Sequence, residues 1–265
     1  MTGIRLVTID LDGTLLDSRQ QVSARNLAVL QRLLDARVIV ALATARDRAS
    51  IAGRVALVRP GLYYIASGGA MVYEPVSRSI VWADTLPPAL AVEVVAFLRR
   101  FNQPVFVNFD CDYWVDRNDD RVAMIKRRYD LQAWHFPRLE EVLLPAMRVS
   151  LSAPRPVLEQ AAQEARAAFG DRANVSLASP DWLDVLEPGA GKGPALAWLQ
   201  AQASVSPDQT LAIGDYDSDL PLFAAAGYRV AMANSVAAIR AAATHRTASN
   251  DEDGVATALE MFFPA

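Results

Sequence analysis

Short apolar runs alternate with segments of helical periodicity along the first part of the chain. The runs at 4–10, 38–43 and 63–66 are too short for helices and rich in β-branched or aromatic residues, which favours buried strands. Between them, apolar residues recur at helical spacing over 22–37, and 47–57 also favours a helix. This rhythm predicts parallel strands with helices on both faces of the sheet.

A different pattern occupies the middle of the chain. It begins after Pro87-Pro88 and ends at Glu187-Pro188-Gly189, two clusters of residues that interrupt regular structure. Between them the pattern predicts an antiparallel sheet with helices. The expected helices are 89–100, 121–129 and 157–169, and the expected strands are 105–109, 113–115, 148–152, 173–177 and 182–186.

The α/β pattern then resumes to the end of the chain. We therefore expect one α/β domain assembled from residues 1–84 and 189–265, with an α+β domain of residues 85–188 inserted into it. His245 is expected in the last strand of the α/β domain. The expected helices are 193–203, 218–226, 236–243 and 255–263, and the expected strands are 210–213 and 228–231.

Composition narrows the classes of partner. The 30 acidic residues outnumber the 26 basic ones, and the pI of about 5.3 argues against a general nucleic-acid binder. A single cysteine, Cys111, excludes an internal disulfide. We find neither a signal-peptide pattern nor an apolar run long enough to cross a membrane, so we expect a cytoplasmic protein without a membrane partner.

Two acidic loops follow predicted strands. The first contains Asp10 and Asp12 before a glycine, and the second contains Asp215, Asp217 and Asp219 after one. Each pattern alone is also typical of a turn or of a helix N-terminus. Because both loops follow strands of one sheet, they can converge on one Mg²⁺, which prefers carboxylates, waters and a substrate phosphate.

Two further segments carry groups suited to an anion. Thr44 follows the second strand, and its hydroxyl with the amides after it can bind a phosphate, although an N-cap role fits it better in isolation. Lys192 lies between glycines at the start of a helix, where the helix dipole disfavours a cation without an anionic partner. The alternative is a surface lysine, but the chain has only one other, Lys126, against 24 arginines.

Taken in order, these segments resemble the haloacid dehalogenase superfamily of phosphohydrolases. Asp10-Leu11-Asp12-Gly13-Thr14 matches the first motif, Thr44 the second, Lys192 the third, and Asp215 with Asp219 the fourth. The position of the insert and the Ser249–Val255 ending resemble the Cof-like subfamily with a class IIB cap. The resemblance implies a Rossmann-like core with an α+β cap that determines substrate specificity.

The resemblance also implies roles for individual residues. Asp10 would attack phosphorus to form an aspartyl-phosphate, and Asp12 would act as general acid and then as general base. Mg²⁺ would be held by Asp10, Asp215 and the backbone carbonyl of Asp12. Thr44, Ala45, Lys192 and Ser218 would bind the phosphate, and Asp219 would orient Lys192 or support the metal. Three positions depart from the family pattern: Ala45 and Gly68 replace a glycine and an asparagine, and Ser218 replaces an asparagine.

The predicted activity is Mg²⁺-dependent hydrolysis of small phosphate monoesters, such as sugar phosphates, by a monomer or homodimer. The alternatives are a phosphatase dedicated to mannosyl-3-phosphoglycerate, trehalose phosphate or sucrose phosphate, and a non-catalytic ligand-binding protein that retains the fold. Arg46 is expected either to reach the far end of the substrate or to form a surface ion pair. A basic helix face is expected to be solvated, or else to attract sugar phosphates; it contains Arg121, Lys126, Arg127 and Arg128.

Overall fold

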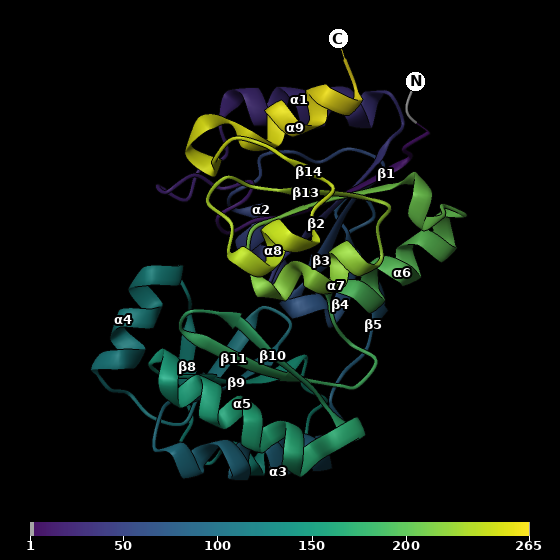
Figure 1. Cartoon of the computed structure of the whole chain (residues 1–265). Coiled ribbons are helices and arrows are strands. Elements are labelled where there is room, and N and C mark those ends of the chain that lie inside the picture. The colour runs from purple at the N-terminus through teal and green to yellow at the C-terminus, as the bar shows by residue number, and fades with distance from the viewer. Residues whose placement is uncertain (1–2, 265) are drawn as a thin grey trace. The chain divides into compact units, whose positions relative to one another are not determined.

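The computed structural model describes residues 3–264, which form two compact units (Figure 1). The core unit consists of Met1–Trp82 with Lys192–Ala265, and the inserted unit consists of Ala83–Gly191. The boundaries that the sequence predicts, after residues 84 and 188, fall beside these divisions.

The core unit is built on an eight-stranded sheet in the order β14-β13-β12-β1-β2-β3-β4-β5. The six strands from β14 to β3 are parallel, and β4 runs antiparallel to β3. The predicted α/β fold with a parallel sheet is therefore confirmed, with β1 between β12 and β2. The strands are β1 (Leu6–Asp10), β2 (Ile39–Ala43), β3 (Leu62–Ala66), β4 (Met71–Glu74), β5 (Ser79–Ala83), β12 (Thr210–Gly214), β13 (Tyr228–Ala231) and β14 (His245–Arg246).

Helices cover both faces of this sheet. On one face, α6, α7 and α8 share a buried apolar cluster with the strands, and on the other α1 packs against α9 (Figure 1). The hydroxyl of Ser23 accepts a hydrogen bond from the amide of Asn26, so Ser23 is the N-cap of α1. The helices are α1 (Ala24–Asp35), α2 (Arg48–Ala52), α6 (Lys192–Ala203), α7 (Leu220–Ala224), α8 (Ala237–Ala242) and α9 (Gly254–Phe262).

The inserted unit has its own six-stranded sheet, in the order β10-β11-β9-β6-β7-β8. Its strands pair antiparallel except for β7 and β8, which are parallel. The inserted α+β architecture is thus confirmed, with β8 as an unpredicted strand. The elements are β6 (Val105–Phe109), β7 (Asp112–Val115), β8 (Ala133–His135), β9 (Arg148–Ser152), β10 (Asn174–Ser179), β11 (Trp182–Leu186), α3 (Pro88–Leu98), α4 (Asp120–Tyr129) and α5 (Arg155–Phe169).

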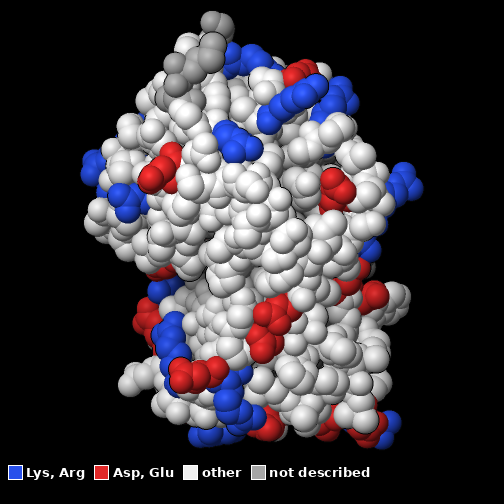
Figure 2. Space-filling model, turned by 90° about the vertical axis from the view of Figure 1, so that its right-hand side faces the viewer, with Lys and Arg blue, Asp and Glu red and all other residues white. Residues whose placement is uncertain are grey.

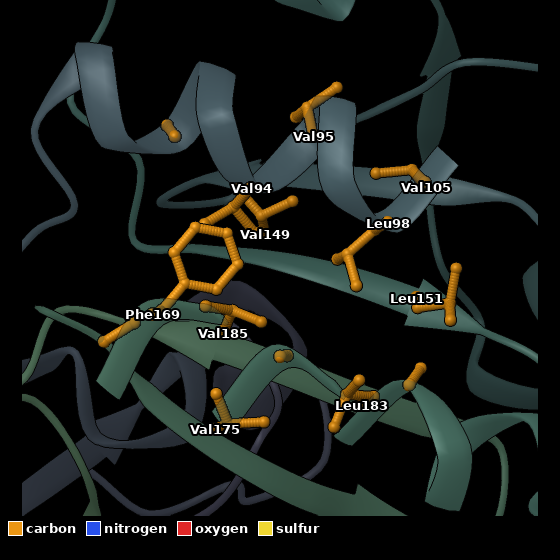
Figure 3. Close-up of a cluster of buried hydrophobic side chains, with 14 of the residues drawn as sticks. Val94, Val95, Leu98, Val105, Val149, Leu151, Phe169, Val175, Leu183 and Val185 are labelled. Atoms are coloured by element: carbon orange, nitrogen blue, oxygen red, sulfur yellow. The ribbon is translucent and has the colours of Figure 1, made fainter. Parts of the chain in front are cut away.

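The two faces of this second sheet differ in chemistry. One face packs against α3 and α5 in an apolar cluster, in which Leu98 of α3 lies beside Leu151 of β9 (Figure 3). Alternation along the strands directs Arg148 and Ser150 to the opposite face. There, Arg148 Nη1 lies 2.8 Å from Asp184 Oδ2, and Ser150 Oγ donates a 2.6 Å hydrogen bond to Asp184 Oδ1.

The predicted basic face of α4 is partly neutralised. Arg121 and Arg128 form ion pairs with Asp181 at 3.4 and 3.0 Å. Basic and acidic side chains also lie close together in small groups on the surface shown in Figure 2. Among residues 3–264, no helix combines the length and the apolar character that crossing a membrane requires.

Short 3₁₀ helices complete the described chain. Two of them, η1 (Ser67–Gly69) and η6 (Asp217–Asp219), contribute to the candidate site. The others are η2 (Arg99–Phe101), η3 (Leu139–Glu141), η4 (Gly170–Arg172), η5 (Pro207–Gln209) and η7 (Asn250–Glu252).

Candidate active site

Three loops of the core unit begin at the carboxyl ends of neighbouring parallel strands. β1 ends at Asp10, and the strands on either side of it, β2 and β12, end at Ala43 and Gly214. Because these three strands pair in parallel, their loops begin at the same edge of the sheet. This is where open α/β sheets bind ligands.

Lys192, the first residue of α6, joins two of the predicted carboxylates. Its Nζ donates hydrogen bonds to Asp10 Oδ1 and to Asp219 Oδ1, each at 2.7 Å. All three side chains are buried. Burial disfavours the charged amine, but Asp10 and Asp219 outweigh this effect and raise the pKa of Lys192. Lys192 is therefore a buried cation within the site, and the surface-lysine alternative is excluded.

Asp215 lies beside this triad and is held by Thr14. The hydroxyl of Thr14 donates a 3.0 Å hydrogen bond to Asp215 Oδ1. Burial, followed by repulsion from Asp219, raises the pKa of Asp215 to about 7. Burial and the Asp219 charge also raise the pKa of Asp10, more than Lys192 lowers it. The site therefore holds more negative charge than its single lysine neutralises.

These carboxylates fit a hard divalent cation. Asp10, Asp215 and Asp219 each offer a carboxylate oxygen, and the three oxygens lie within 4.8 Å of one another. Oxygen-only ligands and a surplus of buried negative charge suit Mg²⁺. Asp219 is already engaged on both oxygens, because Oδ1 accepts from Lys192 and Oδ2 accepts from the amides of Asp215 and Tyr216. Asp10 and Asp215 are thus better suited to bind a metal directly.

Asp12 lies outside this carboxylate cluster. Its side chain is 39% exposed, and its two oxygens are bound by Arg46, with Nε 2.8 Å from Oδ2 and Nη2 2.7 Å from Oδ1. Arg46 itself is only 6% exposed. Of the two expected roles for Arg46, the structure therefore shows an ion pair, which is bidentate and half-buried, with a buried guanidinium and a partly exposed carboxylate.

Thr44 is buried directly after β2. Its hydroxyl accepts a 3.1 Å hydrogen bond from the Arg46 amide, whereas the N-cap of α2 is Asp47, whose side chain accepts from Ser50 N. The N-cap alternative for Thr44 is therefore excluded. Ala45, which is partly exposed, follows Thr44 in the same loop.

Two further departures from the family pattern lie close to these loops, Gly68 in η1 after β3 and Ser218 in η6 after β12. Gly68 has a φ of 75°, a left-handed conformation that glycine adopts freely and that asparagine tolerates better than most residues. Its amide donates a 3.0 Å hydrogen bond to the carbonyl of Thr44, so this loop braces the phosphate-binding candidate. Ser218 lies in η6 beside Asp219, partly exposed.

Sequence reasoning gave no role to three residues that support the site. Thr14 binds Asp215, Gln20 accepts a hydrogen bond from Arg46, and Asn234 donates one of 2.7 Å to the carbonyl of Gly13. Thr14 belongs to the first motif and could have been found there. The contacts of Gln20 and Asn234 could not be read from the local sequence, because they join separate loops.

The sequence matches the profile of the haloacid dehalogenase-like hydrolases over residues 7–259. The chain belongs to this family. It is therefore an enzyme of the hydrolase class, and the predicted family is confirmed.

Curated relatives agree with this assignment. The HMP-PP phosphatase of Serratia proteamaculans is 28% identical, covering 88% of this chain and 85% of the relative. The 5-amino-6-(5-phospho-D-ribitylamino)uracil phosphatase YwtE of Bacillus subtilis is 26% identical, covering 97% of this chain and 98% of the relative. The chloroplastic endoribonuclease YBEY of Arabidopsis thaliana is 28% identical over 96% of this chain, which spans only 45% of that relative.

A solved structure supports the fold. The haloacid dehalogenase-like hydrolase from Bacteroides thetaiotaomicron superposes with a TM-score of 0.85 at 24% identity, covering 98% of this chain and all of that one.

Proposed function

We propose that the protein is a Mg²⁺-dependent phosphatase that hydrolyses small phosphate monoesters through an aspartyl-phosphate. The observation that carries the proposal is the buried triad of Asp10, Lys192 and Asp219, with Asp215 beside it. A carboxylate at a strand end with a cation on one oxygen keeps its other oxygen available as a nucleophile.

The reaction takes place in two steps. Asp10 attacks phosphorus and forms an O–P bond, while the ester O–P bond breaks and its oxygen takes a proton from Asp12. Water then attacks the same phosphorus as Asp12 removes one of its protons, the O–P bond to Asp10 breaks, and inorganic phosphate leaves with the Asp10 carboxylate regenerated. The exposure of Asp12, unlike that of Asp10, suits a group that exchanges protons with a substrate and with water.

Asp10, Asp215 and the backbone carbonyl of Asp12 would hold Mg²⁺. When bound, it would offset the repulsion between the attacking carboxylate and the phosphate. Asp219 keeps Lys192 in place through its 2.7 Å contact and does not need to bind the metal directly.

The phosphate oxygens would be bound by Lys192, the Thr44 hydroxyl, the Ala45 amide and the Ser218 hydroxyl. Charge develops on these oxygens in the transition state, so donors fixed beforehand lower the barrier. Thr44 supports this assignment because it is buried and held from both sides by the chain at Arg46 and Gly68.

We propose small phosphorylated metabolites as substrates, with the inserted unit of residues 83–191 selecting among them. Two relatives are named for such compounds, HMP-PP and a phosphoribitylaminouracil, which supports the class of substrate without identifying the compound. We further propose that the protein works in the cytoplasm, as a monomer or homodimer.

Phosphate release from a panel of sugar phosphates, glycosyl phosphates, nucleotides and 4-nitrophenyl phosphate tests this function. We expect release with Mg²⁺, none with a chelator, and none from Asp10→Asn, whereas Asp35→Asn on the exposed end of α1 stays active. Absence of release by the wild-type protein under all conditions would favour a non-catalytic binding protein.

The same panel measures specificity. One ester exceeding the others about 100-fold in kcat/KM, or ~2.7 kcal/mol of transition-state binding, would indicate a dedicated enzyme. Similar values across the panel would indicate a generalist.

A further inference from the structure

Arg46 is a buried residue that does not belong to the phosphate-binding or metal-binding groups. Its guanidinium meets the Asp12 carboxylate through two nearly parallel hydrogen bonds, of 2.8 Å from Nε and 2.7 Å from Nη2. A two-point contact of this kind restricts both the position and the rotation of the carboxylate, which a single contact does not.

The guanidinium is itself held in place. Nη1 donates to the Ser50 hydroxyl at 3.2 Å, and Nη2 also donates to the side-chain carbonyl of Gln20. Gln20 lies in a loop that Asp17 fixes, because Asp17 Oδ1 accepts from the amides of Arg19 and Gln21 at 2.9 and 2.8 Å.

The backbone of Arg46 is also fixed. Its amide donates to the Thr44 hydroxyl at 3.1 Å, and its carbonyl accepts a 2.8 Å hydrogen bond from Ser67 N. Arg46 therefore links two loops. Its backbone is held within the loop after β2, and its guanidinium binds Asp12 in the loop after β1. Since all three guanidinium nitrogens have partners within the core unit, the expected role of reaching the far end of the substrate is disfavoured.

We propose that Arg46, supported by Gln20, is a positioning residue that holds the Asp12 carboxylate in the orientation needed for proton transfer. The inference rests on the proposed phosphatase function. Asp12 is only partly buried, so without the two hydrogen bonds from Arg46 its side chain is free to adopt other rotamers. Lysine cannot replace the planar fork of arginine, because its single ammonium makes no bidentate contact with a carboxylate.

The experiment compares two substrates that differ in their need for a proton. The alkoxide of a sugar phosphate requires protonation as it leaves, whereas the nitrophenolate of 4-nitrophenyl phosphate does not. For Arg46→Lys we expect kcat/KM to fall about 100-fold on the sugar phosphate, within the usual contribution of general acid catalysis, and less than about threefold on the aryl ester. Asp12→Asn is expected to show the same pattern with a larger loss.

A second variant and two controls separate positioning from other roles. Gln20→Ala is expected to lower kcat/KM selectively on the sugar phosphate by about tenfold. It removes one support of Arg46 and leaves the two Arg46–Asp12 hydrogen bonds. Arg48→Lys, which changes an arginine stacked 5.0 Å from the Tyr73 ring, is expected to leave both substrates unchanged. The inhibition constant of inorganic phosphate is expected to stay constant in Arg46→Lys, because Arg46 does not bind the phosphate.

Each contrary result has a distinct meaning. An equal loss on both substrates, with an unchanged thermal midpoint, overturns the inference and leaves the phosphatase function intact. A weaker affinity for inorganic phosphate also overturns it, in favour of a phosphate-binding Arg46. If the wild type hydrolyses neither ester, the proposed function fails, and the inference fails with it.

Discussion

Gly13, between the first acidic loop and Thr14, occupies a position that excludes a side chain for two reasons. Its φ of 83° is unfavourable for residues with a Cβ, and a Cβ built there would lie 2.5 Å from Asp215 Oδ2. The glycine therefore allows the loop after β1 to approach the carboxylate that follows β12.

Gly13→Ala is expected to lower kcat/KM at least tenfold, because the added methyl displaces Asp215 from the candidate metal site. Phosphate release and Mg²⁺ titration would measure the change. Gly3→Ala is a suitable control, since its Cβ would meet nothing within 4 Å. An Mg²⁺ requirement identical to that of the wild type would contradict this account.

The carboxylates of the site also predict how pH acts on the protein. The pKa of Asp215 is raised from 3.8 to about 7, so the native state binds more protons than the unfolded state between these values. Without metal, stability therefore falls as the pH rises through this range. Bound Mg²⁺ would relieve the repulsion between the carboxylates and would compete with protons for the same oxygens.

We therefore expect Mg²⁺ to raise the thermal midpoint by several degrees at pH 8 and by much less at pH 5.5. Differential scanning fluorimetry at both pH values, with Mg²⁺ or with a chelator, measures the effect. Asp215→Asn should weaken the pH dependence of the thermal midpoint and leave the part due to Asp10, whereas Asp35→Asn should retain it in full. A shift of equal size at both pH values would argue against metal binding at these carboxylates.

Residues whose sequence neighbours already mark them as unusual could be identified from the sequence alone. Asp10 and Lys192 stand out because one ends a buried strand and the other is a rare lysine at a helix start. The position of Arg46 could not be read in this way, because its partners Asp12 and Gln20 lie in a loop that approaches it only after the sheet has formed.

At the scale of elements, the neighbouring strands β9 and β11 of the inserted unit carry a buried ion pair between Arg148 and Asp184. Arg148 also receives support from Tyr113, whose hydroxyl lies 2.9 Å from Nη2. Removing one member of such a pair leaves a buried charge uncompensated. This lowers the free energy of unfolding by more than the intact pair contributes to it.

Asp184→Ala is expected to lower the free energy of unfolding by about 3 kcal/mol. The double variant Arg148→Met, Asp184→Leu should recover most of this loss, because no charge is then buried. Urea denaturation measures both, with Asp171→Ala on the exposed η4 as the control. Equal losses in the single and double variants would mean that the ion pair itself stabilises the sheet.

Long elements were predictable, and the two-residue β14 contains His245 as expected, but the short strand β8 was missed. Helices such as α1 carry several turns of apolar periodicity, whereas β8 has only three residues and no measurable alternation. The helix predicted over 47–57 shortens to Arg48–Ala52, with Gly53 as its C-cap. Periodicity determines such boundaries less strongly than local turn chemistry does.

On the scale of the whole molecule, the inserted unit has a hydrophobic core of its own. Val94, Val149, Phe169 and Val185 are buried together between two helices and one sheet, all within residues 83–191 (Figure 3). A unit with its own core and its own complete sheet meets the requirements of an independently folding domain.

We expect residues 83–191 produced alone to fold and to unfold cooperatively. Circular dichroism and a thermal melt test this, and Leu151→Ala, a buried deletion in the same core, should lower its stability by about 3 kcal/mol. A fragment without a cooperative transition would show that the core unit is needed for its folding.

The central position of β1 has a consequence for protein synthesis. Its pairing with β2 needs only the chain up to Ala43, but its other edge pairs with β12, which begins at Thr210. The ribosome therefore completes the whole inserted unit while half of the hydrogen-bonding capacity of β1 has no native partner. Until then the nascent chain also lacks Lys192 and Asp215, so that Asp10 is present before the cation and the carboxylate that lie beside it, and the candidate site can form only after Asp215 has been synthesised.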